Sequence, residues 1–156
     1  MNASHTTHQP AGFLVIGYGN TLRGDDGVGP RVAEAVEKLS LPGVRTLVCQ
    51  QLSPEYADPV SRALTVVFVD AAVDAPKEVQ LRKLEPGETS QLMAHAADPR
   101  TLLALARDVF GHAPPAWWLT IPAVKLDFSE TLTSEAQRGF AEAVKKIQEL
   151  CRRSQI

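Results

Sequence analysis

The chain has 156 residues, a formal net charge of −2 at pH 7 and a hydrophobic share of 44%. This length and composition are typical of one soluble globular domain. The near-neutral charge gives no electrostatic reason to expect binding to nucleic acid or to an anionic membrane. No apolar run approaches the ~18 residues of a transmembrane helix.

Residues 1–12 are polar and lack the cationic and apolar regions of a secretory signal. We therefore expect a disordered tail, followed by a single domain at residues 13–156. Cys49 and Cys151 are isolated thiols without CxxC spacing. This cysteine usage favours a reducing, cytoplasmic compartment over a disulfide framework.

The first half of the chain alternates apolar runs with segments of helical period. The pattern predicts strands at about Phe13–Tyr18, Val44–Cys49 and Leu64–Asp70, a helix at Pro30–Leu39, and a short helix or structured loop at Pro54–Arg62. Val32, Val36 and Leu39 are expected on the buried face of the first helix. The third strand is continuously apolar, so we expect it to be buried on both faces.

The second half continues the alternation. Val79–Leu84 alternates in polarity and predicts a more exposed strand at a sheet edge. Further elements are expected at Pro99–Phe110 (helix, with Leu102, Leu103, Ala106 and Val109 inward), Trp117–Ile121 (strand) and Ser134–Arg152 (helix), separated by long loops at 86–98 and 122–131. Trp117 and Trp118 should face opposite sides of the sheet.

These elements predict a three-layer α/β/α sandwich. In open sheets of this kind the first three strands commonly lie in the order 2-1-3, and ligands bind at the carboxyl ends of the strands. The first strand leads into a loop that carries Asp25 and Asp26, and the third strand ends at Asp70. The topology would therefore bring these carboxylates near one another.

The loop after the first strand is rich in glycine and reads GYGNTLRGDDGVG from Gly17 to Gly29. It is a poor dinucleotide fingerprint, because Leu22 replaces the third glycine and no acidic residue follows the second strand. Two carboxylates would also repel a phosphate. A nucleotide-binding domain is therefore only a weak third hypothesis.

Four side chains could carry chemistry. Asp25 and Asp26 point in different directions, so one could cap the following helix while the other faces the crevice. Asp70 closes an apolar strand, and His95 lies in a long loop. Two carboxylates and an imidazole form a plausible mixed site for a divalent transition metal. A helix cap, a turn residue and an incidental histidine are the competing explanations.

The glycine-rich string resembles the GxGNxLxxDDGxG signature of hydrogenase maturation proteases, the endopeptidases that trim the large subunit of nickel–iron hydrogenases. The similarity continues with Val66–Ala71, an apolar strand ending in Asp-Ala, and with His95 ahead of the leucine-rich stretch Leu102–Ala106. Leu119–Pro122 and Ser129–Thr133 resemble the family's last strand and its Gly-Glu-x-Leu-Ser segment.

The resemblance implies a twisted, mostly parallel five-stranded sheet between helices. It also implies a cytoplasmic, monomeric endopeptidase that removes the C-terminal extension of a nickel–iron hydrogenase large-subunit precursor after nickel insertion. By motif, Asp26, Asp70 and His95 would contact the nickel that the precursor presents and would also serve catalysis. A non-catalytic nickel-binding or chaperone module for hydrogenase assembly is the alternative.

Three segments depart from the family pattern. Ser129 stands where a glycine often precedes the glutamate, and Ala96–Pro99, after His95, lacks the glycine that some members carry. Gln50–Glu55 replaces the Gly-Thr turn that commonly follows the second strand. This third departure lies near the expected cleft, which leaves open a different substrate preference. None of the three touches the expected metal-contacting residues.

Overall fold

The computed structural model describes residues 12–73, 77–88 and 98–154. Its elements in chain order are β1 (Phe13–Tyr18), the 3-10 helix η2 (Gly24–Gly27), α1 (Val28–Lys38), β2 (Val44–Cys49), the 3-10 helix η3 (Pro54–Tyr56), α2 (Ala57–Ser61), β3 (Thr65–Ala72), β4 (Gln80–Leu84), α3 (Pro99–Phe110), β5 (Ala116–Pro122) and α4 (Ser134–Ser154). Within these described ranges, no helix combines the length and hydropathy that a membrane span needs.

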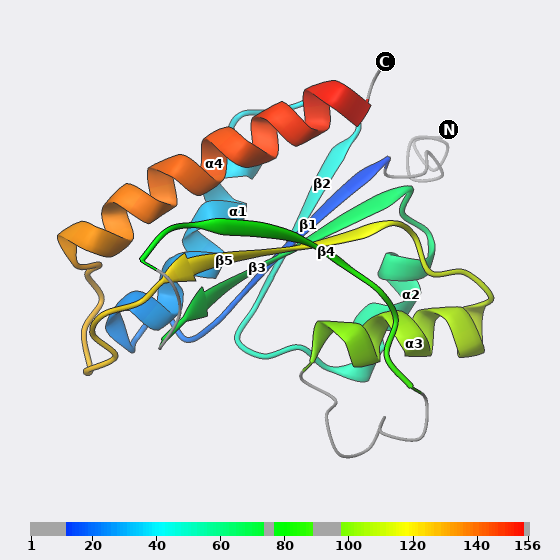
Figure 1. Cartoon of the computed structure of the whole chain (residues 1–156), viewed down its shortest axis with the longest axis horizontal. Helices are drawn as coiled ribbons and strands as arrows, with labels where there is room; N and C mark the ends of the chain where they lie inside the picture. Colours follow the sequence, from blue (N-terminus) through cyan, green and yellow to red (C-terminus); the bar gives the residue numbers. More distant parts are fainter. Residues whose placement is uncertain (1–11, 74–76, 89–97, 155–156) are drawn as a thin grey trace, which may run out of the picture.

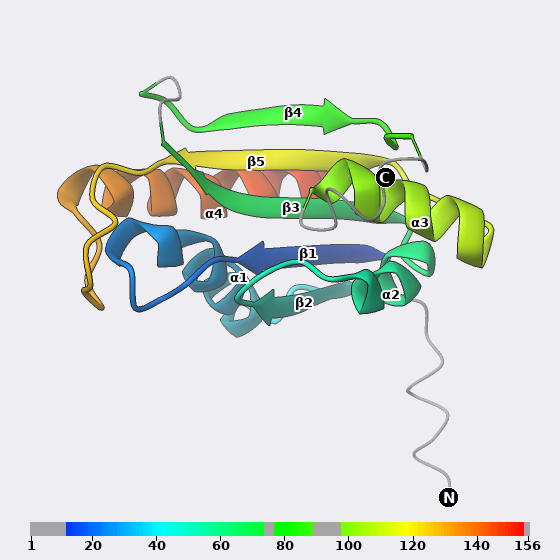
Figure 2. The same cartoon turned by 90° about the horizontal axis from the view of Figure 1, so that it is seen from below.

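One sheet organises the molecule, with the strand order β2-β1-β3-β5-β4. The first four strands of that order run parallel, and β4 pairs antiparallel with β5 at the edge. Helices α1 and α4 cover one face, and α2 and α3 cover the other (Figures 1 and 2). This confirms the predicted three-layer sandwich, the 2-1-3 order and the edge position of the fourth strand.

The two faces of the sheet bury separate apolar clusters. Alternate residues of β1 and β3 divide between them: Val15 and Val67 pack beneath α1 and α4, while Ile16 and Phe68 pack beneath α2 and α3. The four central residues of β3, 66–69, are fully buried, as a strand covered on both faces requires. Trp117 and Trp118 pack against opposite clusters, as the alternation predicts.

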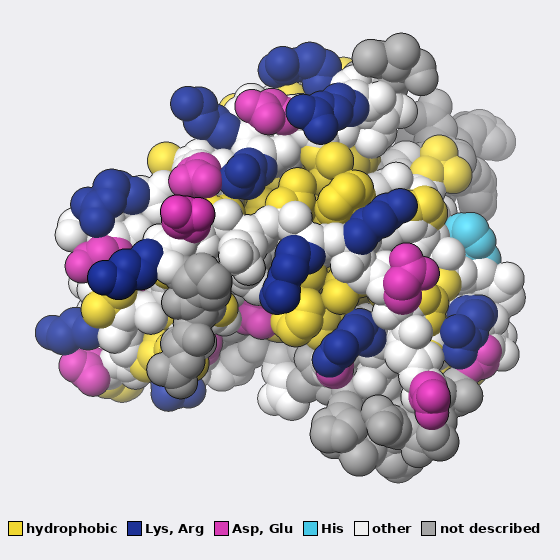
Figure 3. Space-filling view, in the orientation of Figure 1, with side chains coloured by type: hydrophobic (Ala, Val, Ile, Leu, Met, Phe, Trp, Pro, Cys, Tyr) yellow, Lys and Arg dark blue, Asp and Glu magenta, His cyan; other side chains and the backbone are white. Residues whose placement is uncertain are grey.

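Basic side chains cover part of the edge at β4. Arg82 lies over the ring of Trp118 and Lys83 over the ring of Trp117, each 5.8 Å from the ring centroid. Figure 3 shows Lys and Arg side chains interspersed with hydrophobic and acidic ones on the face over β4 and α4. Charged side chains of this kind protect an edge strand from pairing with another chain.

Three expectations about the helices were wrong in detail. Helix α1 begins at Val28 rather than Pro30, because η2 leads into it without a break. Leu39 and Val109 were expected to face inward, but they are 43% and 63% exposed. Both lie at the carboxyl end of their helices, where the helical period continues but much of the side chain stays exposed.

Gly17 and Gly29 allow β1 and the start of α1 to approach closely. A Cβ at Gly17 would lie 2.1 Å from the carbonyl oxygen of Gly29, which is far inside van der Waals contact. We therefore expect Gly17→Ala to lower the free energy of unfolding by about 3 kcal/mol or more, since backbone on both sides has to move. Chemical denaturation measures this effect.

Gly12→Ala is the matched control, because a Cβ there meets its nearest atom at an ordinary 3.5 Å. Equal stability of the two variants would show that the contact between β1 and α1 can relax.

Candidate functional site

The carboxyl ends of β1 and β3 form the candidate site. Gly17 pairs in register with Val69, so the next residues, Tyr18 and Asp70, lie together at the same edge of the sheet. The glycine-rich loop leaves β1 at this point and returns through η2 into α1. The site is therefore built by the loop and by the last residues of β3.

The loop holds Asp26 in a defined orientation. Gly19 has a φ of +145°, and a Cβ there would lie 2.0 Å from the Asp26 carbonyl oxygen, so the loop crosses η2 at a distance that glycine permits. The backbone N–H of Asn20 then donates to Oδ2 of Asp26 over 2.8 Å. These contacts fix the carboxylate of Asp26, which remains partly exposed.

Asp70 lies close to Asp26 and shares its electrostatic environment. The pKa of Asp70 is raised to about 6: burial is the largest cause, a hydrogen bond from Tyr18 opposes it, and the negative charge of Asp26 raises it further. A buried carboxylate whose charge is disfavoured by a neighbouring carboxylate gains when a cation approaches. The structure thus brings together two of the three residues expected from the sequence.

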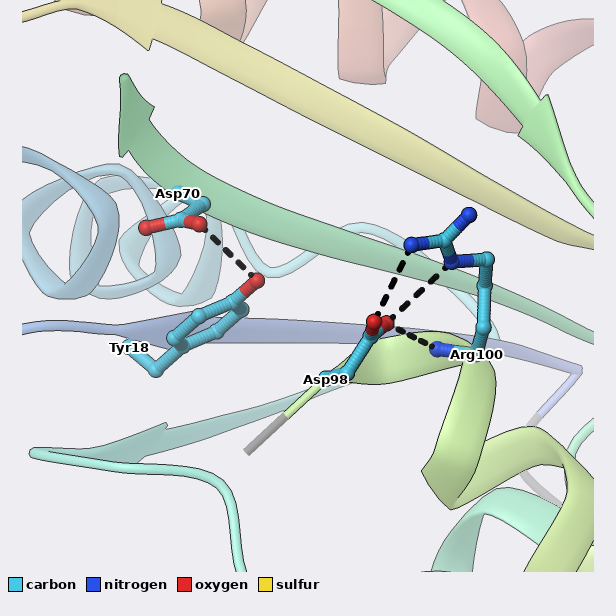
Figure 4. A network of polar contacts seen from close by, with 4 residues as sticks. All are labelled: Tyr18, Asp70, Asp98 and Arg100. Carbon is cyan, nitrogen blue, oxygen red and sulfur yellow. Dashed lines mark hydrogen bonds and ion pairs between the residues drawn. The ribbon is translucent and has the colours of Figure 1, made fainter. Parts of the chain in front are cut away.

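Tyr18 is a site residue that the sequence reasoning missed. Its hydroxyl donates to Oδ2 of Asp70 over 3.1 Å (Figure 4). Burial, together with the charges of Asp70 and Asp98, raises the pKa of Tyr18, so the hydroxyl stays protonated and keeps its role as donor. The signal was present in the parallel pairing of the first and third strands, which places the residue after Gly17 beside the residue after Val69.

The start of α3 faces the same region. Asp98 caps this helix by accepting the backbone N–H of Arg100 over 2.9 Å, and its carboxylate pairs with the Arg100 guanidinium at 3.1 Å (Figure 4). The negative charge of Asp98 contributes to the raised pKa of Tyr18. His95, the third expected metal-contacting residue, precedes this helix but lies in residues 89–97, outside the described residues.

Asp25 has a different role from the expected helix cap. Neither η2 nor α1 has a side-chain cap. The carboxylate is fully buried and instead accepts four hydrogen bonds from residues beyond β5: the backbone N–H groups of Val124, Lys125 and Thr133, and the hydroxyl of Thr133, at 2.8–3.1 Å. Asp25 therefore binds residues 123–133, which we call the strap, to the turn that carries Asp26.

These hydrogen bonds set the charge state of Asp25. Burial alone would raise its pKa, but the bonds from Thr133, Val124 and Lys125 outweigh burial and hold the pKa below its ordinary value. The stabilisation by this carboxylate is present above the pKa of about 4 in the unfolded chain, and it is lost as the pH falls through the lower folded value. The strap therefore remains attached at neutral and mildly acidic pH.

The described residues alone do not complete a metal site. Among them, no group of three or more His, Cys, Asp or Glu side chains is arranged to hold a metal ion. Asp26 and Asp70 supply two carboxylates, which are hard ligands, and further ligands would have to come from elsewhere.

Comparison with solved structures identifies the fold. The chain is similar to the hydrogenase 2 maturation peptidase from a Thaumarchaeota archaeon, with 26% identity, 89% of this chain and 97% of that chain covered, and a TM-score of 0.67. It is also similar to the hydrogenase maturating endopeptidase HybD from E. coli, with 21% identity, 91% and 93% covered, and a TM-score of 0.72.

A third similar structure is the nickel–iron hydrogenase maturation protease HycI from Thermococcus kodakarensis KOD1, with 20% identity, 95% and 97% covered, and a TM-score of 0.71. No protein-family model matches the chain, and no curated protein matches its sequence. The structural comparison confirms the resemblance seen in the sequence: the chain has the fold of the hydrogenase maturation proteases.

Proposed function

We propose that this protein is an endopeptidase that removes the C-terminal extension from a nickel–iron hydrogenase large-subunit precursor after nickel insertion. The observation that carries the proposal is the Asp26–Asp70 pair at the carboxyl ends of β1 and β3, in a chain with the fold of maturation proteases. Burial and the charge of Asp26 disfavour the ionised form of Asp70 until a cation approaches, and the nickel already seated in the precursor would be that cation.

In this proposal the protein recognises the precursor through the nickel that the precursor already holds. Asp26 and Asp70 would approach the nickel together with His95, which must be neutral to bind a metal. A precursor without nickel would leave the two carboxylates uncompensated and would not be positioned for cleavage. The proteolytic step would thereby act as a check on metal insertion.

Two routes to hydrolysis fit these residues. In one, the nickel polarises the scissile carbonyl or activates a water molecule. In the other, the nickel only orients the precursor and a carboxylate takes the proton of the attacking water as a general base. The raised pKa of Asp70 suits the second role, because a general base works best with a pKa near the working pH.

The pH dependence follows from the pKa of Asp70. Below about 6 this carboxyl is protonated, so it can neither contact the nickel as an anion nor accept a proton. We expect kcat/KM for precursor cleavage to fall about tenfold between pH 7 and pH 5, since kcat/KM reports ionisation in the free enzyme. A rate measured by intact mass at each pH tests this.

Circular dichroism at pH 5 is the control, because the lowered pKa of Asp25 should keep the fold intact there. A flat kcat/KM from pH 5 to pH 7 would remove Asp70 from both recognition and catalysis.

The alternative function is a non-catalytic nickel-binding or chaperone module on the same scaffold. Deleting the gene from its host distinguishes the two functions. We expect the deletion strain to accumulate a large subunit that retains nickel and its C-terminal extension. A deletion strain whose large subunit is fully trimmed but poor in nickel would favour the chaperone.

A further inference from the structure

The strap presents exposed hydrophobic side chains beside the candidate site. Phe128 is 86% exposed and Val124 57% exposed, and Leu22 of the glycine-rich loop is 46% exposed. The two segments are bonded to each other: Ser129 N donates to the Leu22 carbonyl over 2.9 Å, and Asp25 N donates to the Lys125 carbonyl over 2.9 Å. The three side chains therefore belong to one continuous structure.

Several hydrogen bonds fix the strap to the glycine-rich loop and to α1. The Asp25 carboxylate accepts its four hydrogen bonds from the strap, Gly24 N donates to the Ser129 carbonyl over 2.8 Å, and the Arg31 guanidinium donates to the Glu130 carbonyl. Figures 1 and 2 show that the strap, between β5 and α4, runs beside the turn that precedes α1. An aromatic side chain on a fixed backbone loses little conformational freedom when a partner covers it.

A groove lies along the strap. It has a volume of about 380 Å³ and is lined by Gly24 of the loop and by strap residues that include Lys125, Phe128 and Leu132. A groove beside an exposed aromatic side chain can accept an apolar side chain of a partner while the aromatic ring inserts into that partner.

The position of the strap indicates what binds there. Its first residue is bonded to the end of β3, since Ala123 N donates to the Ala72 carbonyl over 3.0 Å, and Asp25 joins it to the turn of Asp26. A partner that brings a cation to Asp26 and Asp70 would thus meet the exposed hydrophobic side chains of the strap with the part of its chain that surrounds the cation. The two carboxylates of the site and the exposed hydrophobic side chains beside them, Val124 and Phe128, are complementary to a metal-loaded polypeptide with an apolar segment.

We propose that the strap, with Leu22, is the docking surface for an apolar, extended segment of the metal-loaded precursor that adjoins its scissile bond. The proposal rests on the proposed function for the identity of the precursor. It assigns the strap a role in binding rather than in bond cleavage, so its loss should act on KM and leave kcat nearly unchanged.

Phe128→Ser tests the docking surface, with Leu64→Ser as the matched control. Leu64 is 66% exposed but precedes β3, at the opposite end of the sheet from the candidate site. With the nickel-loaded precursor of the host hydrogenase as substrate, we expect Phe128→Ser to raise KM about tenfold or more, as the loss of an aromatic hot spot does. Its kcat and thermal unfolding temperature should stay near those of the wild type, and Leu64→Ser should change none of these values.

The remaining outcomes separate this proposal from the proposed function. Normal KM in Phe128→Ser, with cleavage intact, would overturn the docking surface and leave the peptidase standing. A wild-type protein that binds the precursor through Phe128 without cutting it would support the docking surface and overturn the peptidase. If sedimentation shows a wild-type dimer that Phe128→Ser dissociates while KM is unchanged, the strap contacts a second copy of this chain and the proposal is overturned.

Discussion

Replacing Asp26 or Asp70 by asparagine is expected to lower the rate of precursor cleavage by on the order of 100-fold or more. Each amide keeps the size of the carboxylate but removes the charge that would meet the nickel. The loss should occur in a folded protein. At pH 7 we expect Asp70→Asn to be as stable as the wild type or more stable by ~1 kcal/mol, because it removes a charge that burial and Asp26 disfavour.

The difference in stability between the wild type and Asp70→Asn should depend on pH. Burial raises the pKa of folded Asp70 to about 6, whereas the unfolded chain has a carboxyl pKa of about 4. The wild type therefore loses some stability as the pH rises through this interval, and Asp70→Asn should not. Thermal unfolding at pH 5 and pH 7 compares the two proteins.

Asp58→Asn is the control for the cleavage assay, since the carboxylate of Asp58, on α2, pairs at the surface with Arg62 and lies outside the candidate site. Cleavage within a few-fold of the wild type by both Asp26→Asn and Asp70→Asn would contradict the assignment. Loss of cleavage in Asp25→Asn, if it folds normally, with full activity in Asp26→Asn, would show that the wrong carboxylate had been assigned to the nickel.

Asp25→Asn is expected to lower the free energy of unfolding by about 3 kcal/mol, because buried donors lose an ionised acceptor. An asparagine in either orientation turns its own N–H groups toward strap donors that now face the carboxylate. The expected loss exceeds the ~1 kcal/mol of a simple helix cap. Urea denaturation provides the value.

Asp127→Asn serves as the matched control, because Asp127 lies on the same strap but is exposed. Its stability should equal that of the wild type. A loss of 1 kcal/mol or less in Asp25→Asn would mean that the strap finds other partners, and that burial of this carboxylate contributes little to the fold.

Most of the sheet could be predicted from the sequence, because strand burial leaves a clear pattern. The continuous apolar run at 64–70 indicated a strand covered on both faces, and the alternation at 79–84 indicated an edge strand. The order β2-β1-β3 followed from the way parallel strands are connected. Leu39 and Val109 were wrongly expected to face inward. The helical period predicts which face of a helix is apolar, but not how far the neighbouring elements extend along that face.

The site was predictable only where residues lie near each other through the sheet. Parallel pairing brings the loop after β1 to the end of β3, and so it brings Asp26 to Asp70. The contact of Asp25 with Thr133 joins residues 108 positions apart, and no local pattern reveals it. A buried aspartate next to a helix start has the same sequence signature as a helix cap, and only the path of the strap distinguishes the two.

The intact mass of the large-subunit precursor, after incubation with this protein, tests the central claim most directly. Purified precursor would be compared in its nickel-loaded and nickel-free forms, with wild-type protein and with Asp70→Asn. We predict that only the nickel-loaded precursor with the wild type loses the mass of its C-terminal extension. Equal cleavage of both forms would contradict recognition through nickel, and an unchanged mass in every sample would contradict the peptidase itself.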